Sequence, residues 1–199
     1  AFDYQQGRPW AYEDLIAPYN FAILKSEAEL ESEKQESLVQ ILPFFNLSEE
    51  TAEEVKNQFG QSFSTSKEAM RESSARQRRF LDAGMEILDS LYMRGVVFLE
   101  DSFAILSPST QVHMVSGNRA ELRRLSDFYT ISGAIEFLRA KAVSMDLPAW
   151  LHSLLLESIA HNVVYYPELT RQATADAVDG ISLSRGMVQQ GERIISRGE

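Results

Sequence analysis

Hydrophobic residues between positions 67 and 93 recur every three or four residues, which is the period of a helix buried along one side. Five residues form this apolar face: Phe80, Gly84, Ile87, Leu88 and Leu91. Gly95 follows the last of them, and glycine is common directly after the end of a helix. The pattern therefore predicts one long helix from Lys67 to Met93.

Two further helices are predicted nearer the start of the chain. Ser26 is followed by Glu29 at the spacing of a capping box, and Pro43 limits the helix that begins there. Ser48 precedes a second helix, whose first turn is acidic and whose end we expect at Gly60.

Short runs of β-branched and aromatic residues predict strands in the middle of the chain. ILPFF at residues 41–45 is apolar enough for a short buried strand. Three more strands are expected at VVFLE (residues 96–100), FAILS (103–107) and QVHMV (111–115). SGNRAELRRL (116–125) is typical of a tight turn followed by another strand.

Helices return after this region. Thr130 is expected to cap a helix that ends near Lys141. Asp146 is expected to cap the next helix, with Pro148 close to its first turn. We expect that helix to reach about Ala160.

The two ends of the chain differ from its middle. YYPELTRQATADAVDG predicts a helix that ends at Gly180, and GMVQQGERIISRGE then indicates a hairpin with one strand on each side of Gly191. The first 24 residues are rich in aromatic residues, and we expect them to be extended. We expect Trp10, Pro18 and Phe21 to pack onto the domain, because so much aromatic area is costly to leave in water.

Helices outnumber strands, which cluster in the middle and at the end. This arrangement predicts an α+β fold, a helix-rich domain with a small mixed β-sheet. We divide the single predicted domain, residues 1–199, into five parts. They are an extended segment (1–25), a helical part (26–93), short strands (94–129), helices (130–180) and a C-terminal hairpin (181–199).

The composition permits a packed core but excludes several classes of partner and site. Of the 199 residues, 44% are hydrophobic, and the formal charge is 19 − 29 = −10. An acidic surface of this kind repels the phosphates of nucleic acids. The chain contains no cysteine, which excludes disulfides, thiolate metal sites and catalytic thiols. No apolar run approaches the roughly 20 residues that span a bilayer.

Few residues are candidates for chemistry. Glu157 and His161 are four residues apart, so on a helix they would share a face and could ligate a metal. No second pair supports them, and a helix with one face in water explains them more simply. His113 is expected to pack or face solvent, and His152 to lie at the surface. Common hydrolase motifs and phosphate-binding glycine loops are absent from the sequence.

The segments ARQRRF and RAELRRL concentrate positive charge on this acidic chain. Their arginines are Arg76, Arg78, Arg79, Arg119, Arg123 and Arg124. Two interpretations remain open, namely solvated surfaces that pair with the acidic surplus or a pocket for an anionic ligand. The carboxylates of Glu49, Glu50, Glu53 and Glu54 fall at the start of a helix, where the helix dipole explains them. We assign no catalytic, cofactor-binding or metal-binding residue, and the ligand-binding residues stay unknown.

Both ends of the chain resemble one bacterial family. GRPWAYEDLIAPYNFAILKSEAEL resembles the start of the extracytoplasmic domain of seven-transmembrane HD-superfamily phosphohydrolases, with the pattern L-x-A-P-(F/Y)-(D/N)-F-x-(I/V)-x-K-S. GMVQQGERIISRGE resembles the end of that domain, G-x-V-x-x-G-E-x-I-x-x-R-G-E, and NVVYYPELTRQATADAV is similar to the segment before it. The family often has proline where Leu183 stands and aspartate where Asn20 stands, which affects only local turns.

The resemblance implies that the parent is a metal-dependent HD hydrolase of the cyclic di-AMP phosphodiesterase type, whose catalytic part lies outside this chain. This chain would be a non-enzymatic sensory or regulatory domain, without a cofactor, on the extracytoplasmic face of the bacterial cytoplasmic membrane. The implied partners are an unknown extracytoplasmic ligand or protein and the transmembrane helices of the same parent chain. The alternative is a structural or assembly module that contacts the cell envelope or mediates receptor oligomerisation.

The same resemblance places one membrane helix before this chain and another soon after it. Because a bilayer surface is planar, we expect the N- and C-terminal extended segments to lie close together, with Phe2 near Arg197. We also expect the hairpin around Gly191 to join the sheet near the N-terminal segment, beside the strand at residues 41–45.

We predict that the purified chain carries no catalytic metal and hydrolyses no cyclic dinucleotide, because its sequence lacks clustered histidine and aspartate ligands. Elemental analysis and an assay with cyclic di-AMP test both statements. Stoichiometric manganese or iron together with turnover would contradict them.

Overall fold

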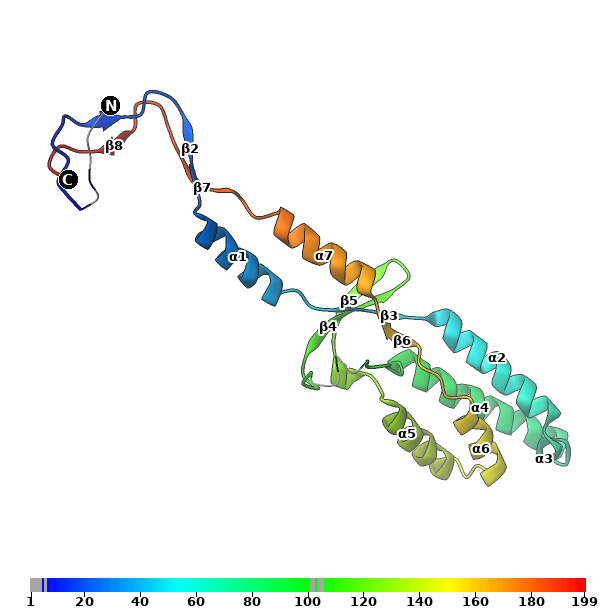
Figure 1. Cartoon of the computed structure of the whole chain (residues 1–199). Helices are drawn as coiled ribbons and strands as arrows, with labels where there is room; N and C mark the ends of the chain where they lie inside the picture. Colours follow the sequence, from blue (N-terminus) through cyan, green and yellow to red (C-terminus); the bar gives the residue numbers. More distant parts are fainter. Residues whose placement is uncertain (1–4, 6, 101–102, 104–105) are drawn as a thin grey trace. The chain divides into compact units, whose positions relative to one another are not determined.

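The computed structural model describes residues 5, 7–100, 103 and 106–199. The chain forms two compact units, whose elements are labelled in Figure 1. The central unit is Leu42–Arg171, and the terminal unit consists of the residues up to Ile41 together with Gln172–Glu199. Helices and small sheets occur together, which confirms the predicted α+β class.

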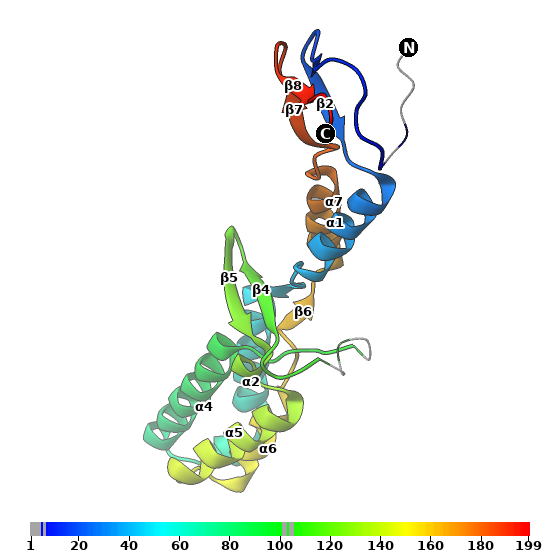
Figure 2. The same cartoon turned by 90° about the vertical axis from the view of Figure 1, so that its left-hand side faces the viewer.

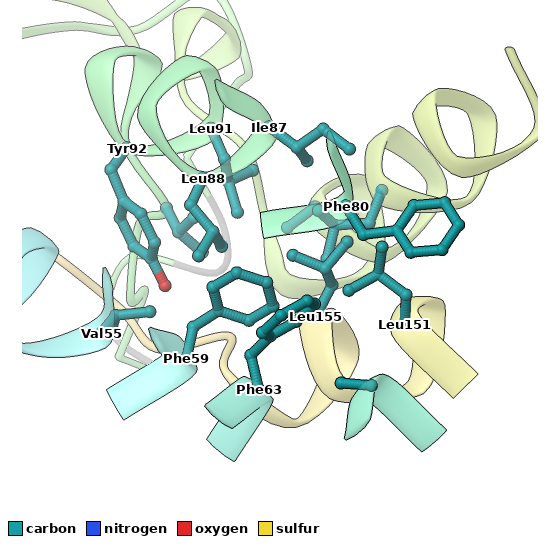
Figure 3. Close-up of a cluster of buried hydrophobic side chains, with 14 residues drawn as sticks. Val55, Phe59, Phe63, Phe80, Ile87, Leu88, Leu91, Tyr92, Leu151 and Leu155 are labelled. Carbon is teal, nitrogen blue, oxygen red and sulfur yellow. The ribbon is translucent and has the colours of Figure 1, made fainter. Parts of the chain in front are cut away.

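The helices of the central unit contribute to its larger hydrophobic core. They are α2 (Glu49–Thr65), α3 (Lys67–Met70), α4 (Ser74–Arg94), α5 (Ile131–Ser144) and α6 (Ala149–Glu157). Figure 3 shows side chains of α2, α4 and α6 that point into one cluster. Leu88, Leu91 and Leu155 are fully buried there, so the apolar face predicted for α4 is confirmed.

Helices α2 and α4 pack closely where the ring of Phe59 lies over Gly84. A Cβ atom at Gly84 would lie 2.2 Å from Cζ of Phe59 and 2.6 Å from its Cε1. The ring is fully buried, so it cannot turn away without displacing the core. This contact explains a glycine inside a helix, where glycine otherwise costs about 1 kcal/mol relative to alanine.

The predicted end of α2 at Gly60 is wrong. The helix continues to Thr65, and Gly60 is an ordinary helical residue inside it. A Cβ atom at Gly60 would lie 3.4 Å from the flexible Cε end of Met85, so this position has room for a side chain.

The single long helix predicted from Lys67 to Met93 is also wrong, because the structure divides it. α3 ends at Met70, and α4 begins after Ser73, whose hydroxyl accepts a hydrogen bond from the N–H of Arg76. Gly95 follows α4 as predicted, with φ of 95°, a conformation that glycine adopts without steric cost.

The sheet of the central unit has the strand order β5–β4–β3–β6. Its strands are β3 (Phe44–Leu47), β4 (Gln111–Ser116), β5 (Arg119–Arg124) and β6 (Val163–Tyr165). β3 runs parallel to β4 and antiparallel to β6, and β4 is antiparallel to β5, so the sheet is mixed. One face packs a second core around Phe45, Val112 and Met114. The strands predicted at residues 41–45, 111–115 and 116–125 are thus confirmed, with shifted bounds.

The segments VVFLE and FAILS form no strand in the part of the chain that the structure describes. Val96 and Val97 make only isolated bridges. The N–H of Phe103 donates to the carbonyl of Glu100 at 2.8 Å, and the ring of Phe103 packs against that of Phe45 at a centroid distance of 5.6 Å. Residues 104–105 of the prediction lie outside the described residues. Phe103 and Leu106 pack against the core beside the sheet, and an extended strand is not required for that.

The two helices after the sheet begin differently. Thr130 caps α5 as predicted, since its hydroxyl accepts from the N–H of Gly133 at 3.1 Å. Asp146 does not cap α6, because its left-handed φ of 51° places it in the preceding turn. Pro148 stands at the N-cap instead, and the helix ends at Glu157, earlier than expected.

The terminal unit contains helical segments and two-stranded sheets (Figure 1). Its elements are β1 (Leu15–Ile16), β2 (Phe21–Leu24), α1 (Glu27–Val39), the part of α7 (Pro167–Asp179) after Arg171, β7 (Ser184–Val188) and β8 (Arg193–Ile195). Ser26 and Glu29 form the predicted capping box of α1, and the N–H of Ser26 lowers the pKa of Glu29. Gly180 follows α7 as predicted.

The pairing predicted for the C-terminal strands is wrong. β7 and β8 lie on either side of Gly191, but β7 pairs antiparallel with β2 and β8 pairs antiparallel with β1. We call these paired strands the terminal ladder. The turn between β7 and β8 is also hydrogen-bonded to the N-terminal segment. The N–H of Gly191 donates to the carbonyl of Ala17, and the N–H of Gln190 donates to the side-chain oxygen of Asn20. Neither strand pairs with β3, whose partners are β4 and β6.

The expected closeness of the two terminal segments is confirmed. The N–H of Trp10 donates to the carbonyl of Glu199 at 2.8 Å, and that of Gly198 donates back to Trp10 at 2.8 Å. Phe2 lies outside the described residues. Trp10 is buried and Phe21 half-buried as expected, whereas Pro18 is exposed, so the packing prediction is wrong for Pro18.

The Phe59–Gly84 contact predicts the effect of one added methyl group. Gly84→Ala should lower the free energy of unfolding by about 1–3 kcal/mol, because the new Cβ overlaps the ring of Phe59. Gly60→Ala is the matched control in the neighbouring helix, and it should be neutral or stabilise by up to about 1 kcal/mol. Urea denaturation measures both, and equal stability of the two variants would contradict the close contact.

Candidate ligand-binding groove

Two hollows of the central unit share part of their lining and together form one groove. The first has a volume of about 1080 Å³ and is lined by residues of β4 and β5. These two strands form the hairpin labelled in Figure 2. The second, of about 510 Å³, lies between the start of α2 and the end of α4. Leu47, Glu49 and Met93 line both.

The hairpin end of the groove is lined by two arginines, Arg119 and Arg123, and two carboxylates, Glu49 and Glu121, and Arg123 pairs with Glu121 at 3.8 Å. Arg119, Glu121 and Arg123 lie on one face of β5, because alternate residues of a strand face the same side. The guanidinium of Arg123 is held in place, since it contacts the sulfur of Met114 at 3.5 Å and lies 5.4 Å from the ring centroid of Phe128. Arg119 makes no side-chain hydrogen bond or ion pair with the residues that the structure describes, so its charge is available.

The helical end of the groove is acidic. Glu49, Glu53 and Asp89 line it, together with one cation, Lys56. Lys56 is bound by Glu53 and by Asp89, and these two hydrogen bonds raise the pKa of its ammonium group. Glu49 accepts a hydrogen bond from Ser116 at 2.8 Å, which joins the start of α2 to the hairpin. The groove therefore offers one cation without a partner among the described residues, Arg119, at its hairpin end and an excess of carboxylates at its helical end.

The floor between these ends is apolar. Leu47, Ala52, Met93 and Met114 contribute to it, and Met93 is 79% exposed. Methionine side chains are flexible and polarizable, so they adapt to ligands of varied shape. An amphipathic ligand with charges at both ends fits this lining better than a small anion.

A buried hydrogen-bond network supports the floor. Asn162, which is 2% exposed, accepts from the N–H of Val96 at 2.8 Å and donates to the carbonyl of Tyr92 at 3.3 Å. The hydroxyl of Tyr92 in turn accepts from the N–H of Ala160 at 2.9 Å. Burial raises the pKa of this hydroxyl. The network fixes the end of α4 against the segment that leads into β6.

The six arginines of the sequence analysis do not converge. Arg119 and Arg123 line the groove, and Arg124 has the opposite orientation on the strand. Arg78 and Arg79 line a separate cleft of about 750 Å³, where carboxylates of α4 also occur. The remaining one, Arg76, pairs with Glu72 at 3.2 Å. A single pocket built from all these arginines is therefore excluded.

A family model described as 7TM-HD extracellular matches residues 10–199. The chain belongs to this family. No curated protein and no solved structure matches it.

Membership of the 7TM-HD extracellular family confirms the resemblance of the two terminal segments. The chain is the part of a membrane protein that lies on the extracytoplasmic side, and this family is not itself catalytic. Among the described residues, no helix has the length and apolar character needed to cross a bilayer.

The structure of this 7TM-HD extracellular domain does not bring Glu157 and His161 onto one helical face. α6 ends at Glu157, and His161 lies in the connection that follows. Its Nδ1 is 3.1 Å from the carbonyl oxygen of Val97, and its ring packs against Phe98. Within the described residues, no group of three histidine, aspartate or glutamate side chains could hold a metal ion.

The other two histidines have structural surroundings. His113 stacks on Phe44 at a centroid distance of 4.5 Å, in agreement with the expectation that it packs. His152 is less exposed than expected, and its Nε2 is buried without a hydrogen-bond partner among the described residues. Neither residue lines the groove.

Sequence reasoning missed most of the groove in this extracellular domain. Glu49 and Glu53 were explained by the helix dipole alone, but both also line the groove. The one available signal was the alternation of RAELRR, which places Arg119 and Arg123 on one face.

The network beneath the groove predicts a stability effect. Asn162→Ala should lower the free energy of unfolding by about 1–3 kcal/mol, because the buried N–H of Val96 loses its acceptor. Asn118→Ala, at the exposed turn between β4 and β5, is the matched control and should change it by less than about 0.5 kcal/mol. Thermal and urea unfolding measure both, and a wild-type value for Asn162→Ala would rule out the network as a stabilising element.

Proposed function

We propose that this chain is a non-catalytic sensory or regulatory domain that binds a ligand outside the membrane and modulates cyclic dinucleotide hydrolysis by a cytoplasmic HD domain of the same protein. The observation that carries the proposal is the family match over residues 10–199. The metal-dependent chemistry belongs, in this proposal, to the HD domain.

The groove supports a ligand of a particular kind. Arg119 offers a cation at the hairpin end, carboxylates outnumber cations at the helical end, and the floor contains methionines. A short extended peptide with charges of both signs matches this distribution. Because Arg119 has no side-chain partner among the described residues, a ligand carboxylate can bind it without first breaking an ion pair.

The position of the groove also supports a regulatory role. Leu47 is the last residue of β3 and lines the groove, so a bound ligand touches the end of that strand. β3 pairs with β6, and the N–H of Tyr166 donates to the carbonyl of Phe44 at 2.8 Å. The chain enters β3 from α1 and leaves β6 into α7. A ligand that binds two states of these strands with different affinity shifts the balance between them by that difference.

Thermal unfolding with a library of short synthetic peptides tests the ligand site. Peptides that bind should raise the melting temperature in proportion to the logarithm of their concentration. Arg119→Gln should weaken that binding about tenfold, because it removes a charged hydrogen-bond donor. Arg78→Gln, in the separate cleft, is the matched control. Absence of any stabilising peptide, or equal effects of the two variants, would reject the groove as the site.

Regulation is tested with the full-length protein in membranes. A peptide that binds the groove should change the rate of cyclic di-AMP hydrolysis, and Arg119→Gln should raise the concentration needed for this effect. Binding without any change in hydrolysis would reject the regulatory role while leaving the ligand site intact.

A further inference from the structure

The described residues of the terminal unit form no hydrophobic core cluster of their own. Among its described residues, the buried hydrophobic ones are Trp10 and Ala17. The terminal ladder is only two strands wide along its whole length. Two-stranded ladders are marginally stable in water unless something packs on them. The ladder therefore requires support from outside its own backbone pairing.

The ladder region, by which we mean residues 7–25 and 183–199, nevertheless exposes many large hydrophobic side chains. Seven of the fourteen such residues in the described part of the chain belong to it. They are Tyr12, Ile16, Tyr19, Leu24, Leu183, Met187 and Ile194. Exposed apolar side chains that gather in this way mark a surface that docks on something.

The apolar side chains include a defined face of the ladder. Met187 lies directly opposite Ala22, and side chains at opposite positions of an antiparallel pair share a face. Leu24 follows Ala22 at the period of two that keeps it on that side. Leu24 is 69% and Met187 62% exposed, so this face carries two largely uncovered side chains.

The charge of the ladder region differs from that of the rest of the chain. Residues 7–25 and 183–199 carry five basic and four acidic side chains, 5 − 4 = +1, whereas the whole chain carries −10. The basic residues are Arg8, Lys25, Arg185, Arg193 and Arg197. Three of them form ion pairs, Lys25 with Glu33, Arg185 with Glu29 and Arg193 with Asp14, and Glu29 and Glu33 lie outside the counted ranges. Arg8 and Arg197, which form no ion pair with the described residues, are the cations that remain for an anionic partner.

We propose that the terminal ladder docks on the surface of a bilayer that contains anionic phospholipids. Tyrosine side chains such as those of Tyr12 and Tyr19 favour the membrane–water interface, and basic side chains bind anionic headgroups. The 7TM-HD extracellular family places the chain beside a membrane. A second copy is a poorer occupant, because in a symmetric dimer the basic side chains of one ladder would face those of the other.

The absence of cysteine makes a direct test possible. Met187→Cys and Met70→Cys place one thiol each for an environment-sensitive fluorophore. Met70 is 61% exposed and lies in the central unit, so it is a control of the same residue type and exposure. Vesicles of phosphatidylcholine with phosphatidylglycerol should shift the emission at position 187 to the blue and leave position 70 unchanged.

A second measurement uses unlabelled protein. Leu24→Gln should lower the vesicle partition coefficient about tenfold, because it removes an apolar side chain from the docking face. Met70→Gln should leave the coefficient unchanged, and circular dichroism verifies that both variants are folded. Equal responses at positions 187 and 70, no response at 187, or a blue shift at 187 caused by raised protein concentration without vesicles would each overturn the proposal. These vesicle experiments are done without a peptide in the groove. A negative result would therefore overturn the membrane proposal without bearing on the proposed ligand site.

Discussion

The pairing of β3 with two strands that are distant in sequence is the interaction on which the central unit depends. Phe45 lies opposite Met114 of β4 on one side and opposite Tyr165 of β6 on the other. The strand ends at Leu47, and Ser48 then caps α2 by accepting from the N–H of Thr51 at 3.0 Å. The start of α2, and with it the acidic end of the groove, is therefore positioned by the hydrogen bonds of one short strand.

Local features of this fold could be predicted from the sequence because their physical causes are local. The caps at Ser26, Ser48 and Thr130 each depend on a hydrogen bond that spans three residues, so the chain itself contains both partners. The break before Ser74 and the passage of α2 through Gly60 depend on packing between helices. Periodicity alone carries no information on such packing.

The positions of the strands could be predicted more easily than which strands pair with one another. Alternation indicates which side chains share a face, but it does not identify the neighbouring strand. The groove illustrates the same limit, because Leu47, Met93 and Met114 meet only once the sheet and α4 have formed. Of the arginines, only those of β5 could have been placed together beforehand, since their spacing within one strand is fixed.

The antiparallel pairing of the first and last strands constrains the order in which the molecule folds. Leu15 lies opposite Ile195, so β1 has no partner until β8 has been synthesised. Closing so long a loop directly would carry a large entropic cost. The central unit, Leu42–Arg171, contains all the strands of its own sheet. It can therefore fold before the N-terminal strands β1 and β2 have found their partners. Once the central unit has folded, most of the residues between β1 and β8 are already ordered. The entropic cost of bringing these two strands together is then smaller.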